Sequence, residues 1–405
     1  MNKRLFIVSN RLPLTVSEEN QLLPASGGLV TAINSYLCGT SNHGFSEIFW
    51  AGVPGCKAGS WQEATKEIKD TTFTYLPVFV EEQLYEGYYN GHSNSVLWPL
   101  FHYFPSYAEY DSGSYEKYIR VNGDFLYTLI KYLHPHDTVW IHDYHLLPLA
   151  CLLRQEFPEL TIGFFLHIPF PSYELIRLMP RQWQEDMLAG MMGADVVGFH
   201  TIDYAAHFLQ SVQMVLGLDH DRHIIRYKDR LVKVDVFPIS INYGQFNQSY
   251  HDEKVMHLRQ SLWQRWDQQK IIFSVDRLDY TKGVSNRLQA YEQFLLQNPE
   301  YHGKVVFIMV IVPSRDTIPK YAERKKMIDE MSSNINSKIG NIHWQPVIYQ
   351  YHSLDFEEML ALYTGCDLAL ITPMRDGMNL VAKEFVASRE DKRGVLVLSE
   401  MAGAA

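Results

Sequence analysis

Cysteine is scarce in this sequence. Only four occur in 405 residues, at Cys38, Cys56, Cys151 and Cys366. No two of them form a C-x-x-C pair, and none stands at the spacing of a structural zinc site. Small secreted domains that depend on disulfides use cysteine far more densely. We therefore predict buried thiols, no disulfide framework and a cytoplasmic location.

Long hydrophobic runs are also missing. Val305–Val312, one of the longest apolar runs, is far below the roughly 20 residues that a membrane-spanning helix needs. Behind Lys3 and Arg4 the apolar stretch covers only Leu5–Val8, which is too short for the core of a secretory signal peptide. The sequence therefore predicts no membrane partner and no signal peptide.

Positive charge is in deficit as well. The chain has 36 Lys and Arg against 46 Asp and Glu, which gives a net charge of −10. Proteins that bind nucleic acids hold the phosphates with clustered Lys and Arg, so we predict no nucleic-acid partner. With 46% hydrophobic and 20% charged residues, the composition is that of a folded globular protein and excludes disorder for the bulk of the chain.

Short β-branched runs alternate with longer amphipathic stretches along almost the whole chain. This alternation predicts parallel sheets with helices on both faces. A hairpin interrupts it at Ile224–Tyr227 and Val232–Val236. The predicted strands are Leu5–Val8, Ile48–Ala51, Val139–Ile141, Ile162–Leu166, Val196–Phe199, Ile271–Val275, Val305–Ile311, Leu368–Ile371 and Val395–Leu398. The predicted helices are Tyr118–Leu133, Tyr204–Leu216, Val284–Gln297 and Ile318–Ile335.

The length of 405 residues is right for two domains of about 200 residues each. We predict an α/β fold of two Rossmann-like domains facing across a cleft, residues 1–238 and 239–405. Pro238 precedes the polar stretch Asn242–Asp252, which is the predicted connection between them. The second domain is expected to be C-terminally incomplete, because the small-residue turn Met401–Ala405, which should start another helix, ends the sequence.

Two motifs in the first half follow predicted strands. Ser9-Asn10-Arg11 comes after Leu5–Val8, and Gly27-Gly28 then opens a helical pattern. Two glycines at a helix start let a phosphate approach free backbone amides, although a plain glycine turn explains them equally well and G-x-G-x-x-G is absent.

His142-Asp143-Tyr144-His145 follows Val139–Ile141, and His167-Ile168-Pro169-Phe170-Pro171 follows Ile162–Leu166. Ligands in open α/β sheets bind at the carboxyl ends of strands, so an aspartate that holds sugar hydroxyls fits this place. A metal site at the histidine cluster and a structural role for His167 remain alternatives.

Two further motifs stand in the second half. In Arg277-Leu278-Asp279-Tyr280-Thr281-Lys282-Gly283, two cations flank a turn before a helix, which suits a diphosphate leaving group. A pair of solvated side chains is the alternative. In Arg375–Val381 with Glu384, Asn379 can cap a helix and two carboxylates can hold sugar hydroxyls, while paired carboxylates also fit a glycoside hydrolase. The aromatic segments Tyr85–Tyr89 and Trp98–Tyr103 are typical of core packing, but the interleaved Gly87, Asn90, His92 and Asn94 favour a loop that stacks on a sugar.

Taken together, these motifs resemble the trehalose-6-phosphate synthases, which are retaining glycosyltransferases of family 20. The resemblance extends in the same order from residue 4 to residue 405, and it includes the segment Tyr89…Leu97-Trp98-Pro99. It implies the GT-B architecture and glucose transfer from UDP-glucose to glucose 6-phosphate, which yields trehalose 6-phosphate and UDP without a metal or another cofactor. Relatives often form dimers or tetramers, so a homo-oligomer is an open expectation.

The resemblance also implies roles for individual residues. Those expected to take part in catalysis are Arg277, Lys282, His167 and Asp376. Those expected to bind the donor are Gly27, Gly28, Arg277, Lys282, Leu354, Asp376, Gly377, Met378, Asn379, Leu380, Val381 and Glu384. Those expected to bind the acceptor are Arg11, Tyr89, Trp98, Asp143 and Arg315.

Other functions stay open at this point. A related transferase could use another acceptor, as glucosylglycerol-phosphate synthase does, and a relative with a degraded site could act as a non-catalytic sugar-phosphate sensor. The intact Arg277 and Lys282 and the intact Asp376–Glu384 segment disfavour a sensor. The base of the donor nucleotide is not predicted, because UDP-, GDP- and ADP-glucose differ in a group that is read largely by backbone atoms.

Overall fold

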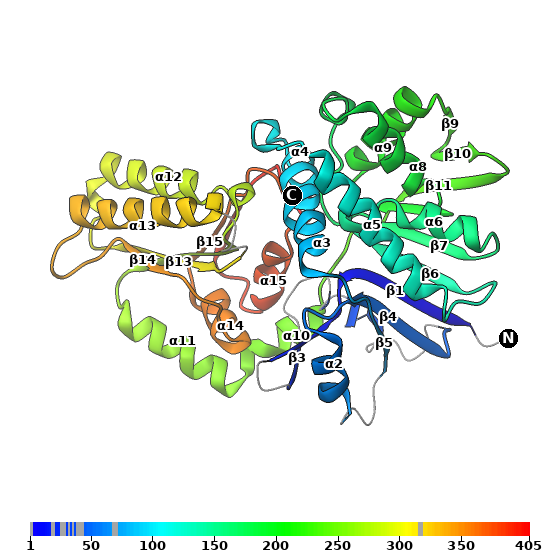
Figure 1. The fold of residues 1–405 in the computed structure, drawn as a ribbon. Coiled ribbons are helices and arrows are strands. Elements are labelled where there is room, and N and C mark those ends of the chain that lie inside the picture. The colour runs from blue at the N-terminus through cyan, green and yellow to red at the C-terminus, as the bar shows by residue number, and fades with distance from the viewer. Residues whose placement is uncertain are drawn as a thin grey trace. The chain divides into compact units, whose positions relative to one another are not determined.

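The computed structural model describes residues 3–17, 21–24, 30, 33–34, 36–37, 44–66, 72–314 and 319–405 (Figure 1). The chain divides into two compact units, Met1–Ile239 and Ser240–Ala405. Gly27, Gly28 and Arg315, three of the expected site residues, lie outside the described residues. No helix in the described part of the chain combines the length and the apolar character that crossing a membrane requires.

A nine-stranded sheet forms the centre of the first unit, in the order β5-β4-β1-β6-β7-β8-β11-β10-β9. Neighbouring strands from β5 to β11 pair in parallel, and β10 and β9 continue the sheet in antiparallel pairs. The strands are β1 (Arg4–Arg11), β4 (Glu47–Val53), β5 (Thr74–Pro77), β6 (Thr138–His142), β7 (Thr161–Phe165), β8 (Val196–Phe199), β9 (His220–Asp221), β10 (Ile224–Tyr227) and β11 (Arg230–Val236), and β2 (Leu14–Val16) pairs separately with β3 (Leu22–Pro24).

Helical segments connect these strands. They are α2 (Ala58–Thr65), α3 (Glu82–Glu86), the π-helix η1 (Gly87–Leu97), α4 (Trp98–Phe101), η2 (Pro105–Tyr107), α5 (Ser112–Leu129), η3 (Tyr144–Leu146), α6 (Leu149–Glu156), α7 (Tyr173–Ile176), α8 (Arg181–Met191) and α9 (Ile202–Leu216). The Asp111 side chain accepts a hydrogen bond from the Ser114 amide and so caps α5. Gly217, at φ 68°, ends α9 in the left-handed conformation that glycine adopts at low cost.

The second unit contains a parallel five-stranded sheet in the order β14-β13-β12-β15-β16. Its strands are β12 (Lys270–Arg277), β13 (Val305–Val312), β14 (Val347–Gln350), β15 (Leu368–Ile371) and β16 (Val395–Leu398). Its helical segments are α10 (Tyr243–Gln248), η4 (Ser249–His251), α11 (Glu253–Arg265), η5 (Tyr280–Lys282), α12 (Val284–Gln297), η6 (Pro299–Tyr301), α13 (Pro319–Ile339), α14 (Phe356–Gly365) and α15 (Leu380–Ser388). Helices α12 and α13 cover one face of the sheet, and α11 and α14 cover the other (Figure 1).

The central strands of both sheets are buried on two faces, which explains their continuous apolar runs. Leu5 to Val8 in β1 are each at most 4% exposed, and the residues of β13 from Val305 to Ile311 are all buried. A strand that is covered on one face only would instead alternate apolar and polar residues. The predicted parallel sheets are therefore present in both units.

The predicted connection, Asn242–Asp252, lies just after the boundary between the units, inside the second unit, and is mostly helical. Asn242 accepts a hydrogen bond from the Gln245 amide and caps α10, while Phe246 is buried in the core of the second unit. A polar composition did not indicate this, since one cap and one buried aromatic side chain are enough to hold a short helix.

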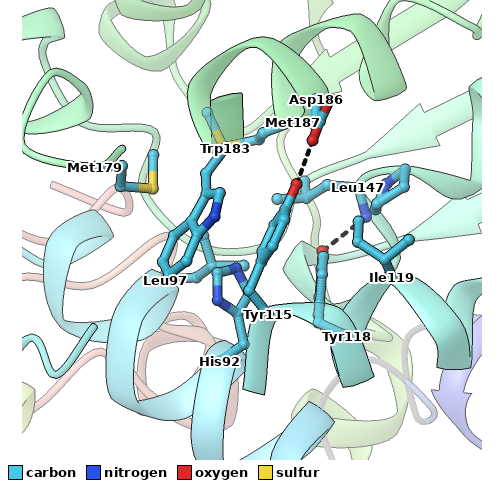
Figure 2. Close-up of a pocket in the computed structure, with 11 residues that line it drawn as sticks. His92, Leu97, Tyr115, Tyr118, Ile119, Leu147, Met179, Trp183, Asp186 and Met187 are labelled. Carbon is cyan, nitrogen blue, oxygen red and sulfur yellow. Dashed lines mark hydrogen bonds between the residues drawn. The ribbon is translucent and has the colours of Figure 1, made fainter. Parts of the chain in front are cut away.

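The aromatic segments Tyr85–Tyr89 and Trp98–Tyr103 do not form the expected loop, because the chain folds there as α3, η1 and α4, and their contact with a sugar stays a prediction. A Cβ atom on Gly91 would lie 2.4 Å from the Ser114 Oγ and 2.7 Å from its Cβ, so this glycine permits close packing of η1 on α5. His92 and Tyr115 meet Trp183 beside a small cavity (Figure 2). The volume of this cavity is about 10 Å³. The Tyr115 ring stacks on Trp183 with 4.5 Å between centroids. Much of this aromatic segment therefore builds the core.

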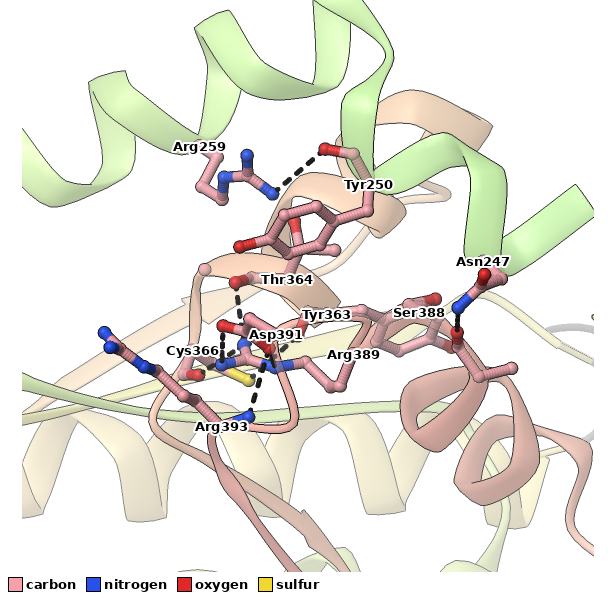
Figure 3. A network of polar contacts seen from close by, with 12 residues as sticks. Asn247, Tyr250, Arg259, Tyr363, Thr364, Cys366, Ser388, Arg389, Asp391 and Arg393 are labelled. Atoms are coloured by element: carbon pink, nitrogen blue, oxygen red, sulfur yellow. Dashed lines mark hydrogen bonds and ion pairs between the residues drawn. The ribbon is translucent and has the colours of Figure 1, made fainter.

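The C-terminal end of α14 is held by one arginine (Figure 3). The Arg389 Nη1 donates hydrogen bonds to the carbonyl oxygens of Tyr363, Thr364 and Cys366 at 3.1, 2.7 and 3.0 Å. Its guanidinium also pairs with the Asp391 carboxylate at 3.0 Å. The last carbonyls of a helix have no partner within the helix, so Arg389 satisfies groups that would otherwise be buried without one.

Candidate active site

In the first unit, Arg11 and Tyr89 lie together. The Arg11 guanidinium, at the exposed end of β1, lies over the Tyr89 ring with 5.1 Å between the central carbon and the ring centroid. Its Nε donates to the Tyr85 hydroxyl at 3.4 Å, and the Asn10 amide donates to the same hydroxyl at 3.3 Å. Two aromatic side chains and an amide thus hold an exposed cation at the carboxyl end of β1.

Asp143 follows β6 in an uncommon backbone conformation. Its φ is 76°, in the left-handed region that residues other than glycine rarely adopt. Residues in this conformation cluster at functional sites. The Asp143 amide donates to the Phe165 carbonyl at 2.8 Å, and its carboxylate accepts from the His167 amide at 3.2 Å. His145, two residues on, stacks on the Tyr89 ring at 5.5 Å. The ends of β1, β6 and β7 are therefore linked through Tyr89, Asp143 and His167.

Trp98 is placed differently from the other expected acceptor residues. It is only 5% exposed, and its ring lies 4.1 Å from that of His102 and 5.7 Å from that of Tyr144, measured between centroids. The Tyr144 hydroxyl in turn donates to the Asn94 amide oxygen at 2.9 Å. Trp98 therefore supports the segment that carries Asp143.

Three histidines stand at the ends of neighbouring strands. The rings of His142 and His167 are joined by a 3.0 Å contact between Nδ1 and Nε2, and the ring of His200 lies 5.6 Å from that of His167. Burial lowers the pKa of His142 to about 3 and lowers the pKa of His167 well below its ordinary value, with the neighbouring histidines adding to the second shift. Both rings are therefore neutral at neutral pH.

No metal site was found in the described part of the chain, where no three His, Cys, Asp or Glu side chains gather as ligands would.

In the second unit, the ends of β12 and β15 meet around Lys282. Its ammonium donates to the Asp376 carboxylate at 2.5 Å, and the Asn379 amide donates to the same oxygen at 3.0 Å. Gly283, at φ 66°, lies so close to the end of β15 that a Cβ atom would approach the Thr372 carbonyl oxygen to 2.7 Å. Only glycine fits at this close contact between the two loops without strain, and the contact places Lys282 next to Asp376.

Arg277 is exposed at the end of β12. Its side chain makes no hydrogen bond or ion pair with any residue that the structure describes, in contrast to Lys282. A solvated guanidinium at the carboxyl end of a parallel strand is available to a ligand, and its planar fork of donors matches phosphate oxygens.

The loop from Asp376 leads into the N-terminus of α15. Asn379, at φ 75°, accepts a hydrogen bond from the Ala382 amide at 3.0 Å, so the predicted cap is present. Gly377, Met378 and Asn379 are buried, and Leu380 and Val381 form the first turn of the helix. The first amides of a helix carry partial positive charge and favour an anion.

Glu384 lies on the second turn of α15, as predicted. It is partly buried, and its carboxylate accepts a hydrogen bond from the Tyr363 hydroxyl at 2.9 Å. Burial raises the pKa of Glu384, and the bond from Tyr363 partly opposes that shift. Leu354, before α14, lines a groove of about 250 Å³ together with Gln350 and His352.

Sequence reasoning missed Arg287, which lies under this cluster. Its guanidinium pairs with Asp276 at 2.8 Å, and both side chains are at most 4% exposed. It also donates to the Thr372 hydroxyl at 3.1 Å and to the Lys282 carbonyl at 3.1 Å. Arg287 therefore joins the end of β12, the turn at Lys282 and the end of β15. A cation on the inward face of the predicted helix Val284–Gln297 is the signal that could have found it.

The chain is similar to known proteins over almost its whole length. The model of Glycosyltransferase family 20 matches residues 3–405. The bifunctional trehalose-6-phosphate synthase/phosphatase of Thermoproteus tenax is 44% identical over 405 residues, which cover 99% of this chain and 55% of that protein. The chain spans about half the length of that relative and of one other curated relative.

Solved structures match the fold. One is the α,α-trehalose-phosphate synthase (UDP-forming) from Burkholderia xenovorans in complex with glucose-6-phosphate. It has a TM-score of 0.88 and 30% identity with this chain, and the match covers 99% of this chain and 86% of that one. The Escherichia coli protein bound with UDP-2-fluoro glucose has a TM-score of 0.87 and 32% identity, with coverage of 100% and 86%. The predicted α/β fold with two parallel-sheet domains is confirmed by these matches and by the two sheets.

Proposed function

This chain belongs to glycosyltransferase family 20, and from that premise we propose that it is a retaining glucosyltransferase. It transfers glucose from UDP-glucose to glucose 6-phosphate and releases UDP, and the product is α,α-trehalose 6-phosphate. The names of its relatives support this proposal, because the matched proteins include a UDP-forming trehalose-phosphate synthase in complex with glucose-6-phosphate and a relative bound with a UDP-sugar analogue. We therefore also assign this chain to trehalose biosynthesis.

The observation that carries the proposal is the cationic cluster of the second unit. The ammonium of Lys282 is oriented by Asp376, while the Arg277 guanidinium is exposed and has no described partner. A glycosyl transfer that releases a nucleoside diphosphate builds negative charge on the leaving phosphate. Cations that are already in place stabilise that charge without reorganisation. Arg277 and Lys282 bind the diphosphate and act on the leaving group.

The rest of the donor binds along the same loops. The amides of Leu380 and Val381 at the start of α15 suit the diphosphate, and Glu384 accepts hydrogen bonds from the ribose hydroxyls. Asp376 to Asn379 surround the glucose and phosphate, and Leu354 contacts the base through its backbone. Gly27 and Gly28 are proposed donor contacts from the family resemblance alone.

The acceptor belongs to the first unit. The exposed Arg11 guanidinium, held against Tyr89, pairs with the phosphate of glucose 6-phosphate, and Asp143 accepts hydrogen bonds from sugar hydroxyls. Arg315 is a second proposed phosphate ligand by resemblance. Trp98 contributes by supporting Tyr144 beside Asp143, since its own ring is buried.

His167 contacts the transferred glucose, and no side chain forms a covalent bond to it. The acceptor hydroxyl attacks from the face on which the phosphate leaves. Positioning of two bound substrates can supply several kcal/mol of the barrier reduction by itself, so a protein nucleophile is not required. The cations take the place that a metal ion has in other transferases, so we also propose that the reaction needs no metal.

An acceptor panel tests this function. The protein is incubated with UDP-glucose and with glucose 6-phosphate, glucose or glycerol 3-phosphate, and UDP release is measured. Glucose 6-phosphate should be strongly preferred, because glucose leaves the Arg11 cation without its phosphate. Preference for glycerol 3-phosphate would assign the chain to the glucosylglycerol-phosphate synthases. The absence of UDP release with every acceptor would support a non-catalytic sensor and contradict the proposal.

Variants sharpen the test. Arg11→Ala should raise the KM for glucose 6-phosphate by about 10- to 100-fold, which is the value of one hydrogen bond to a charged group. UDP binding should stay nearly unchanged. Arg222→Ala is the matched control, since Arg222 is also an exposed arginine of the first unit but lies in the β9–β10 turn. Equal KM values for the two variants would refute the role of Arg11.

A further inference from the structure

His142 is buried next to a proposed substrate contact but has no role in the function proposed above. It is the last residue of β6 and is 1% exposed, and its ring lies 4.5 Å from that of Trp140. Its Nδ1 lies 3.0 Å from the Nε2 of His167, which follows β7. Two ring nitrogens at this distance share one proton, so one of them donates and the other accepts.

The second nitrogen of His142 decides which one donates. Its Nε2 is buried and has no hydrogen-bond partner among the residues that the structure describes. The neutral ring of His142 carries its single proton either on Nδ1, facing His167, or on this buried Nε2. A buried N–H without an acceptor is rarer and more costly than a bare acceptor atom, so the proton belongs on Nδ1.

We propose that His142 is a positioning residue that donates from Nδ1 to the Nε2 of His167 and thereby fixes the tautomer of His167. With its Nε2 accepting, the neutral ring of His167 must carry its own proton on Nδ1. His167 is partly exposed, and its Nδ1 has no partner in the described part of the chain. His167 therefore presents an N–H donor and selects an oxygen acceptor, such as a sugar hydroxyl.

The backbone of this site adds to the same arrangement. The His167 amide donates to the Asp143 carboxylate at 3.2 Å, so His167 is held from its main chain as well as from its ring. The ring is thus fixed in place and in proton position before a ligand arrives. Preorganised donors of this kind need not be reoriented when the substrate binds, so no free energy is spent on reorganisation. The identity of the ligand as the transferred glucose rests on the function proposed above, but the tautomer does not.

Nitrogen-15 NMR of the histidine rings tests the tautomer directly on the full chain without substrate. The His167 signals are identified by their loss in a His167→Gln variant. We expect a protonated Nδ1 and an unprotonated Nε2 on His167 at neutral pH. A protonated Nε2 on His167, with the Nε2 of His142 also protonated, would overturn the proposal. This measurement needs no enzymatic activity, so its outcome is independent of whether the glucosyltransferase assignment is correct.

Two variants then separate positioning from packing. His142→Asn places an amide nitrogen near the position of the ring Nδ1 and can still donate, whereas His142→Leu keeps similar bulk without a donor. We expect His142→Leu to give mixed His167 tautomers and to lower kcat/KM for UDP-glucose about tenfold, the value of one neutral hydrogen bond. His142→Asn should restore the single tautomer and most of the rate. If the two variants have the same His167 tautomer signals, the proposal is wrong.

Discussion

Removal of the Arg389 guanidinium should destabilise the second unit far more than removal of a neighbouring charge. In Arg389→Ala, the carbonyls of Tyr363, Thr364 and Cys366 lose their shared donor, and Asp391 loses its cation. The Arg389 side chain is 9% exposed, so water can replace only part of these bonds. Losing one partner of a fully buried ion pair costs about 3–5 kcal/mol in measured cases, and because the Asp391 side chain is 19% exposed we expect a smaller loss of about 2–3 kcal/mol.

The matched control is Arg393→Ala. Arg393 is an exposed arginine four residues away in the same loop, and its backbone amide, which the substitution keeps, donates to Asp391 at 3.1 Å (Figure 3). Its free energy of unfolding should stay within about 0.5 kcal/mol of the parent. Arg389→Lys keeps the charge without the fork of donors and should fall between the two.

Urea unfolding gives the global stability, and hydrogen exchange followed by mass spectrometry gives the local stability of α14. The amides near the C-terminus of α14 should exchange much faster in Arg389→Ala, because the end of the helix frays without its cap. A loss below about 1 kcal/mol in Arg389→Ala, with α14 still protected, would refute the reasoning that these carbonyls depend on Arg389.

Three further predictions concern activity and pH. Arg277→Ala and Lys282→Ala should each lower kcat with UDP-glucose at least about 100-fold with the circular dichroism spectrum unchanged, since one preorganised donor is worth about 2.7–4 kcal/mol in the transition state; near-parent rates would remove the diphosphate role. Activity should persist in EDTA, and loss of activity that Mg²⁺ restores would contradict the proposed metal independence. The buried rings of His92 and His142 have pKa values lowered to about 3, so the unfolded state binds more protons between pH 6.5 and 3, and stability falls as the pH drops. Urea unfolding should show a loss of about 2 kcal/mol for each of these two rings from pH 7 to pH 5, to which the buried His167 ring adds in the same direction, and His142→Asn should lack the loss from its own ring.

Most strands were predictable from the sequence as short apolar runs, and in the central strands these runs are continuous because both faces of the sheet are buried. Val196–Phe199, Leu368–Ile371 and Val395–Leu398 were predicted with the bounds that the structure has. The short strand Val347–Gln350 was missed, because two of its four residues are polar or aromatic and it borders a polar loop. The π-helix at Gly87–Leu97 was interpreted as a loop, since glycine at a close helix contact and glycine in a turn look the same in a sequence.

The candidate site was predictable residue by residue but not in its pairings. Polar side chains directly after strands, such as Asp143 after β6 and Arg277 after β12, were found because parallel strands end at one edge of a sheet. The bond between Lys282 and Asp376 joins residues 94 apart in the sequence, and it depends on how two loops meet at Gly283. The contact of His142 with His167 depends in the same way on the register of β6 and β7. Such contacts follow from the fold and are not visible in a motif.

We propose that the chain transfers glucose with retention from UDP-glucose to glucose 6-phosphate. A proton NMR time course of the protein with both substrates tests it most directly, because it resolves the anomeric protons of the product and the release of UDP together. We expect an α,α-linked disaccharide phosphate that forms in step with UDP and without any metal added. A β-linked product, free glucose in place of the disaccharide, or no consumption of UDP-glucose would contradict it.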